Sequence, residues 1–262
     1  LVAELAADGG GLARNLAALS FAAGQIRDRL SPDHWRLVVT AAGCLDGLAV
    51  DPQAALADEG IAVSAPDVVA ALKRLGTQLS AITGSQTDRM TRDDGWRLLT
   101  LGRQLERLSA MANLLGALFR RNAVLGDSAF GLLLDLFDST ITYRAHYPGR
   151  QEIPALLNLL VLEPANPRSI ACVLGVLRKE LARLPGAADG PGAALADLLP
   201  VPAEGAAAGT ALAALCERDG QGRYQALLDL AAQLDAAASA LSNDISRRYF
   251  SHVSGRDQTL TA

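Results

Sequence analysis

The feature that most constrains the fold is a run of apolar residues at alternating spacings of three and four between Asp93 and Arg121. On a helix of 3.6 residues per turn, this spacing gathers the apolar side chains into one stripe that must pack against other elements. The stripe contains Leu98, Leu101, Leu105, Leu108, Ala112, Leu115 and Phe119. A second apolar side, with Trp96, Leu99, Leu114 and Leu118, predicts that this helix lies at the centre of a bundle.

Helical patterns recur along the rest of the chain. They extend over Leu12–Leu30, His34–Ala49, Asp67–Ile82, Asp93–Arg121, Ser128–Tyr147, Pro167–Leu184 and Arg223–Arg248. Three starts are marked by proline, which the first helical turn tolerates: Ser31-Pro32, Ala65-Pro66 and Asn166-Pro167, where Asn166 is the predicted N-cap. Alanine and leucine dominate, and β-branched residues are sparse. We therefore predict an all-α fold, a bundle of about seven main helices.

The same patterns suggest how the chain is organised. We expect residues 1–86 to be the end of a first helical unit, 87–184 a second unit, 185–210 a loose Pro/Gly/Ala-rich connection, and 211–262 a C-terminal helix that completes the bundle. Arg14–Ser31 can be laid over Arg168–Pro185, which favours two related units, although Ala/Leu-rich helices also match by chance. Since the chain begins at Leu1 rather than Met, we expect a piece of a longer polypeptide.

Composition excludes several classes of function. The formal net charge of −4 gives no overall basic field, so nucleic-acid binding is not expected. No apolar run approaches the ~18 residues that would span a membrane. The three cysteines, Cys44, Cys172 and Cys216, are odd in number and far apart, which fits a reduced, cytoplasmic setting.

Motifs for catalysis and cofactor binding are absent from the sequence. His34, His146 and His252 are isolated, so no metal site is expected. There is no P-loop, dinucleotide fingerprint or nucleophile elbow, so no cofactor is expected and the chain alone should neither bind nor hydrolyse ATP.

Charged residues interrupt the second apolar side of the central helix. Arg103, Glu106 and Arg107 lie between its apolar turns, which makes them candidates for a buried ionic cluster. Arg103 and Glu106 can pair at i,i+3, whereas Arg107 diverges by about 100° and should reach another helix. Arg144 continues the apolar face of the next predicted helix, after Ile141, and is also expected to point inward. Structural ion pairs and a ligand-binding cleft both remain open interpretations.

Two further segments carry polar groups. Asp138, Ser139 and Tyr143 form an unusually polar stretch after an apolar run. Arg168 and Ser169, at the helix start after Asn166-Pro167, are candidates for an anion site, with a plain N-terminal cap as the alternative.

Four stretches carry a resemblance to a known family: TRDDGWRLLTLGRQLERL (91–108), FDSTITYRAHY (137–147), LLNLLVLEPANPRSI (156–170) and RRYFSH (247–252). In their order and spacing they resemble the bacterial alpha-E family, named for its helical character and its Glu-Arg motif. The resemblance assigns Glu106 and Arg107 to the Glu-Arg pair without giving them a role. It assigns to the second and third motifs Asp138, Ser139, Tyr143, Arg144, Asn166, Pro167 and Arg168. It also implies that the first helical unit is truncated, because another such helix normally precedes it.

The resemblance also implies a function. Similar proteins are encoded beside, or fused behind, a circularly permuted ATP-grasp protein, often with a transglutaminase-like protease. The implied role is a non-catalytic, substrate-presenting companion of an ATP-grasp peptide or amide ligase. The alternative is a helical enzyme of the same modification system that uses Glu106 as acid or base; it requires a pocketed carboxylate with a displaced pKa. The expected partners are the ligase domain, the transglutaminase-like protein and a second copy of this chain.

Overall fold

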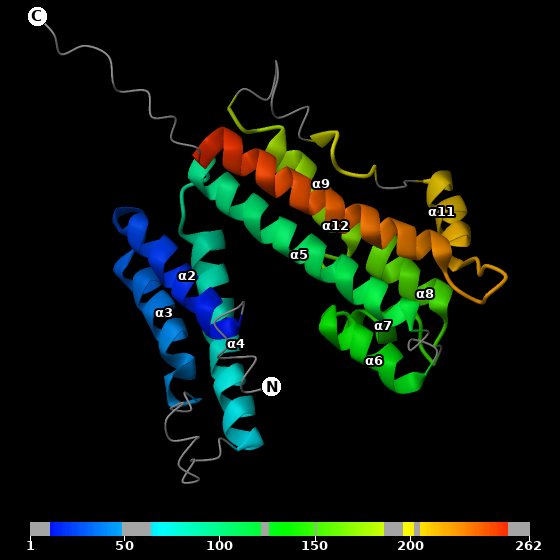
Figure 1. Cartoon of the computed structure of the whole chain (residues 1–262), viewed down its shortest axis with the longest axis horizontal. Coiled ribbons are helices and arrows are strands. Elements are labelled where there is room, and N and C mark those ends of the chain that lie inside the picture. The colour runs from blue at the N-terminus through cyan, green and yellow to red at the C-terminus, as the bar shows by residue number, and fades with distance from the viewer. Residues whose placement is uncertain are drawn as a thin grey trace, which may run out of the picture. The chain divides into compact units, whose positions relative to one another are not determined.

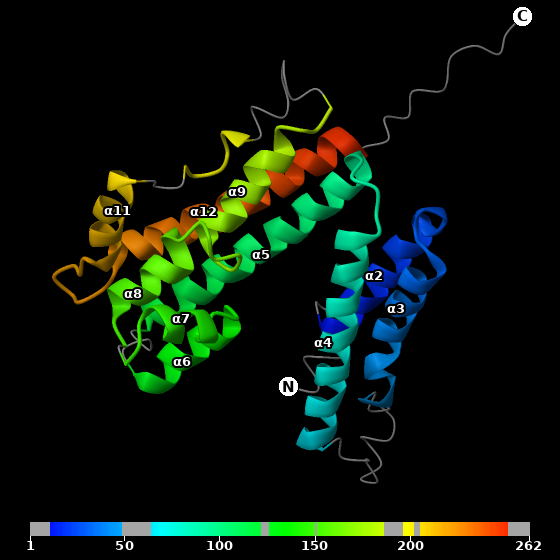
Figure 2. The same cartoon turned by 180° about the vertical axis from the view of Figure 1, so that it is seen from behind.

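The computed structural model describes residues 11–48, 64–121, 126–149, 151–185, 196–201 and 205–250. Within these ranges it contains ten α-helices and no strand, which confirms the all-α prediction with more helices than expected. Figures 1 and 2 show the helices from opposite sides. The chain divides between Arg92 and Asp93 into two compact units, each with its own apolar core. The predicted boundary after residue 86 lies inside the last turn of a helix that ends at Asp88.

The first unit contains three main helices: α2 (Leu12–Gln25), α3 (Pro32–Ala42) and α4 (Ala65–Asp88). Short 3₁₀ segments, η1 (Arg27–Arg29) and η2 (Gly43–Leu48), follow α2 and α3. α3 packs against both α2 and α4. The Ser31 and Ser64 hydroxyls cap α3 and α4 by accepting backbone N–H bonds, and proline occupies the first turn of each helix. The two proline-marked starts predicted here are therefore confirmed.

The second unit is built on α5 (Asp94–Arg120), with α9 (Ile170–Leu181) and α12 (Gln225–Ile245) packed along it (Figures 1 and 2). Both neighbours run antiparallel to α5, because Phe119 meets Tyr224 edge-on at a centroid distance of 5.2 Å while Arg97 meets Glu180. The predicted seam of α5 is buried from Leu101 to Phe119. The central position predicted for this helix is confirmed.

The single helix predicted over Ser128–Tyr147 is two helices, α6 (Asp127–Leu136) and α7 (Thr140–His146). Asp138 separates them with φ of 48°, a left-handed conformation that ends a helix. The apolar register of α6 does not continue past this break: Ile141 is 85% exposed, and Arg144 is exposed as well. The predictions that Ile141 and Arg144 face inward are wrong.

Two further helices were not expected. α8 (Ile153–Leu157) continues into a π-helical turn, η5 (Asn158–Leu162), and its leucines are buried on nearly every side, so the sequence shows no amphipathic period. α11 (Ala206–Cys216) begins within the predicted 185–210 connection, of which 186–195 and 202–204 lie outside the described residues. A π-helical turn, η6 (Ser246–Phe250), follows α12. None of the helices in the described ranges has the length and apolar character needed to cross a membrane.

Candidate functional site

Glu106 and Arg107, adjacent on α5, face different neighbours. Glu106 is exposed, on a solvent stripe with Gly102, Ala110 and Asn113, and makes no ion pair within the described part of the chain. The prediction of a buried salt bridge from Glu106 is therefore wrong. A helical angle gives only the direction of a side chain. Whether that direction is covered depends on which neighbour lies at that level of a 27-residue helix.

Glu106 lies on a groove of about 450 Å³ between α5 and α12. The groove is lined by Gly102, Leu105, Glu106, Ser109, Ala238, Ser239, Ser242 and Asn243. Its apolar lining belongs to the core, since Leu105 and Ala238 are buried, while Ser239, Ser242 and Asn243 are exposed. A Cβ placed on Gly102 would meet no atom within 4 Å, so the space above this residue is open. The groove is thus polar at its rim and carries one carboxylate.

Arg107 turns toward the start of α9. Because α5 and α9 are antiparallel and Arg97 meets Glu180, ten residues further along α5 brings Arg107 level with Ile170, the first residue of α9. Arg107 is half-buried, and burial lowers the pKa of its guanidinium; the neighbouring charges of Arg168 and Arg103 lower that pKa further. Arg107 makes no ion pair with a carboxylate of the described residues. We call Arg103, Arg107 and Arg168 the arginine cluster.

Arg168 is the member of the cluster that contacts the second motif. Its Nη2 donates to Asp138 Oδ2 at 3.0 Å, an ion pair in which both side chains are largely exposed. Asp138 therefore joins the turn between α6 and α7 to the turn before α9. The motifs that the sequence placed about 30 residues apart meet here.

Buried hydrogen bonds hold the same two turns together. Asn166 Nδ2 donates to Leu159 O at 3.0 Å and to Ser139 Oγ at 3.3 Å, while Asn166 Oδ1 accepts the Arg168 N–H at 3.1 Å. Ser139 Oγ in turn donates to Phe137 O at 3.0 Å. Asn166 and Ser139 are both buried. Their polar groups are satisfied within the fold, so we interpret them as structural residues.

Ser169, not Asn166, is the N-cap of α9. Its Oγ accepts the Cys172 N–H at 3.0 Å and donates to Glu163 O at 2.6 Å. Because Ser169 is buried and its hydroxyl is committed to these bonds, the plain-cap interpretation of this helix start holds, and the anion interpretation for Ser169 is wrong. The predicted N-cap Asn166 instead forms a turn ahead of the helix.

Tyr143 is also a structural residue. It is buried in edge-on contact with Phe130, and its hydroxyl accepts the Glu152 N–H at 3.3 Å. Burial raises the pKa of this phenol. Arg144, one residue on, points to solvent and is not part of the arginine cluster.

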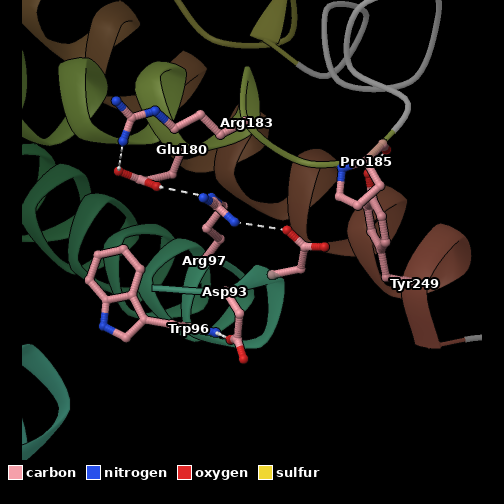
Figure 3. Close-up of polar contacts among 8 residues, drawn as sticks. Asp93, Trp96, Arg97, Glu180, Arg183, Pro185 and Tyr249 are labelled. Carbon is pink, nitrogen blue, oxygen red and sulfur yellow. Dashed lines mark hydrogen bonds and ion pairs between the residues drawn. The ribbon is translucent and has the colours of Figure 1, made fainter. Parts of the chain in front are cut away.

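A buried carboxylate does exist, but at Glu180 of α9 (Figure 3). Its side chain is 7% exposed and lies 3.9 Å from Arg97 Nε and 3.8 Å from Arg183 Nη1. Arg97 also pairs with Asp94 at 2.9 Å. Sequence reasoning missed this cluster, although Glu180 follows Leu177 by three residues and precedes Leu184 by four on the apolar stripe of α9.

The fold and this arrangement define an all-helical domain in which neither Glu106 nor Arg107 of α5 forms an ion pair with another described residue. The profile of the Alpha-E family, described as a predicted alpha-helical domain with a conserved ER motif, matches residues 3–250, and the chain belongs to this family. Glu-Arg occurs twice in the chain, at 106–107 and at 217–218. Only the first pair lies inside a long helix, on α5.

Curated relatives are uncharacterized proteins of Mycobacterium tuberculosis and Mycobacterium bovis, each 28% identical over 180 residues, which is 68% of this chain and 20% of the relative. The chain thus spans about a fifth of the length of these relatives. No solved structure matches it.

Proposed function

We propose that this domain is a non-catalytic helical companion of an ATP-grasp ligase, and that it presents a carboxylate-bearing substrate for peptide or amide formation. The observation that carries the proposal is the environment of the Arg107 side chain. Its guanidinium is half-buried beside the like charges of Arg168 and Arg103, and it has no carboxylate partner within the described residues.

A bound anion would offset the repulsion that Arg168 and Arg103 exert on Arg107. Like charges disfavour one another more strongly where water is partly excluded, and a bound carboxylate reverses the sign of the interaction. Guanidinium groups bind carboxylates through two parallel hydrogen bonds, which gives geometric specificity as well as attraction. ATP-grasp enzymes join carboxylates to amines, so a companion that holds a substrate carboxylate suits that chemistry. Asp138 neutralises Arg168 only in part, because this pair is largely exposed.

The companion role has two further supports. In the mycobacterial relatives, four fifths of the chain lies outside the segment that matches this domain, so there the domain acts within a much longer polypeptide. Leu132, Leu136 and Ile141 expose apolar surface on α6 and α7, which suits contact with the ligase, a transglutaminase-like protein or a second copy. We place the system in a reducing bacterial cytoplasm, which suits the three free cysteines.

The alternative, an enzyme with Glu106 as acid or base, takes second place. Glu106 is exposed, and among the described residues no other titratable side chain lines its groove. General acid–base catalysis by a carboxylate typically uses a side chain enclosed in a pocket, whereas Glu106 lies exposed on an open groove.

The test is calorimetric titration of the chain with a short peptide that ends in two glutamates. We expect binding that weakens at least tenfold in Arg107→Gln and remains unchanged in Arg120→Gln, an exposed arginine in the last turn of the same helix. Equal affinity in the Arg107→Gln variant would overturn the carboxylate site. Reconstitution with the ligase should then give an amide product whose yield falls in Arg107→Gln, whereas product formed by this chain alone would favour the enzyme.

A further inference from the structure

We infer that the groove between α5 and α12 binds a primary ammonium group, such as the side chain of a lysine, with Glu106 as its counter-ion. The groove lies on the side of α5 that faces α12, whereas Arg107 turns toward α9. It is therefore a second site, with the opposite charge preference from the arginine cluster.

The charge and hydrogen-bonding groups of the groove suit a cation. Glu106 is an exposed carboxylate without an ion pair in the described part of the chain, and no Lys or Arg lines the groove. Ser239, Ser242 and Asn243 on α12 supply hydroxyl and amide oxygens that accept hydrogen bonds. An ammonium group is a compact charge with three donors, which one carboxylate and two neutral oxygens would satisfy.

One end of the groove carries additional negative charge. Ser109, which lines the groove on α5, donates its hydroxyl to Asp235 Oδ1, and Asn113 Nδ2 donates to the same oxygen at 3.0 Å. These donors fix the Asp235 carboxylate beside the groove. Asp235 makes no ion pair with a described cation, so its charge adds to that of Glu106.

The shape of the groove also suits a lysine. Leu105 and Ala238 give it an apolar lining, against which a chain of methylene groups can pack while the charged end stays at the polar rim. The open space above Gly102 is where such a stem would enter. Identifying the amine as the second reactant of an amide-forming system rests on the proposed function, whereas the binding itself rests on the groove.

The test is an NMR titration of ¹⁵N-labelled chain with N-acetyl-lysine amide. We expect shifts of the Glu106, Ser239 and Ser242 amide signals that saturate, and no such shifts with the ligand acetylated at its ε-nitrogen. Affinity should fall at least tenfold in Glu106→Gln and stay unchanged in Glu217→Gln, which removes the same charge from the other Glu-Arg pair. Gly102→Ala, which adds a methyl group in the groove, should weaken binding severalfold.

Equal shifts with the ε-acetylated ligand, or unchanged affinity in Glu106→Gln, would overturn the inference. Titration with the peptide that ends in two glutamates separates the two proposals. Loss of amine binding with intact Arg107-dependent peptide binding refutes the groove alone, and the reverse pattern refutes only the carboxylate site.

Discussion

Glu180 and Glu106 place the same side chain in opposite situations within one helical unit. Glu180 is buried where α9 meets α5, between Arg97 and Arg183. Glu106 is exposed on α5 itself, at a groove that no described Lys or Arg lines. A buried charge contributes to the fold through its partners, and losing one partner leaves the others uncompensated. An exposed, unpaired charge contributes little to folding. We therefore assign Glu180 a role in stability and propose that Glu106 contacts a group outside the domain.

Removing Glu180 should have the largest effect on stability. Glu180→Ala removes the carboxylate that Arg97 and Arg183 share and leaves a cavity where α9 meets α5, so we expect a loss of about 3 kcal/mol in the free energy of unfolding. Urea unfolding followed by circular dichroism measures this change. Glu217→Ala, at an exposed position, is the matched control and should change stability by less than about 0.5 kcal/mol. Equal midpoints for the two variants would show that Glu180 does not stabilise the unit.

The second-largest loss of stability is expected when the buried hydrogen bonds of Asn166 are removed. Asn166→Ala removes the bonds to Leu159 O and Ser139 Oγ, leaves buried polar atoms unsatisfied, and should cost about 1–3 kcal/mol. Thermal unfolding measures it, with Asn15→Ala on the exposed face of α2 as control. If the Asn166→Ala variant has the same melting temperature as the Asn15→Ala control, the two turns are held together by other contacts.

Gly102→Ala should act in the opposite direction. Gly102 is exposed within a helix and an added Cβ meets nothing within 4 Å, so alanine should stabilise the second unit by about 0.5–1 kcal/mol. The same variant should bind the amine more weakly, which separates stability from binding at one position. A lower unfolding midpoint would mean that the groove does not tolerate the methyl group.

The smallest expected effect is the pH dependence that Asp219 gives to stability. Backbone N–H groups of Arg223, then of Gln221, together with the Arg223 side chain, hold the pKa of Asp219 below its ordinary value of 3.8. Because the folded-state pKa is depressed, the small stabilisation from this turn is present above the unfolded-state pKa and is lost as pH falls through the folded-state pKa. An NMR titration of the Asp219 carboxyl carbon should give a midpoint below 3.8. A midpoint at or above that value would contradict the contacts of the turn.

Much of the fold follows from the sequence. The three-and-four spacing from Leu101 to Phe119 gives a stripe that can only be buried, and the Ser-Pro start of α3 forms as predicted because capping is a local interaction. The break at Asp138 could not be read in this way. It depends on the left-handed backbone conformation of Asp138, which a residue other than glycine adopts only when its surroundings hold it there. The partner of Asp138, Arg168, lies 30 residues further along the chain.

The candidate site was predictable only in part. The divergence of Arg107 from Glu106 follows from about 100° per residue, and Arg107 does turn toward another helix. Which direction is covered by a neighbour is a property of tertiary packing, so Glu106 was wrongly assigned to the interior and the buried Glu180 was missed. Local pattern gives the face of a helix, and long-range packing decides what that face meets.

We propose that Glu106 of the Glu-Arg motif serves contact rather than folding. The direct measurement is urea unfolding of Glu106→Gln beside Glu180→Gln, in chains with Trp35→Phe so that fluorescence reports only Trp96 of the second unit. The free energy of unfolding of Glu106→Gln should lie within about 0.5 kcal/mol of that of the unchanged chain. Glu180→Gln should lose more than about 1 kcal/mol, since its charged partners remain. Destabilisation of Glu106→Gln as large as that of Glu180→Gln would contradict the account.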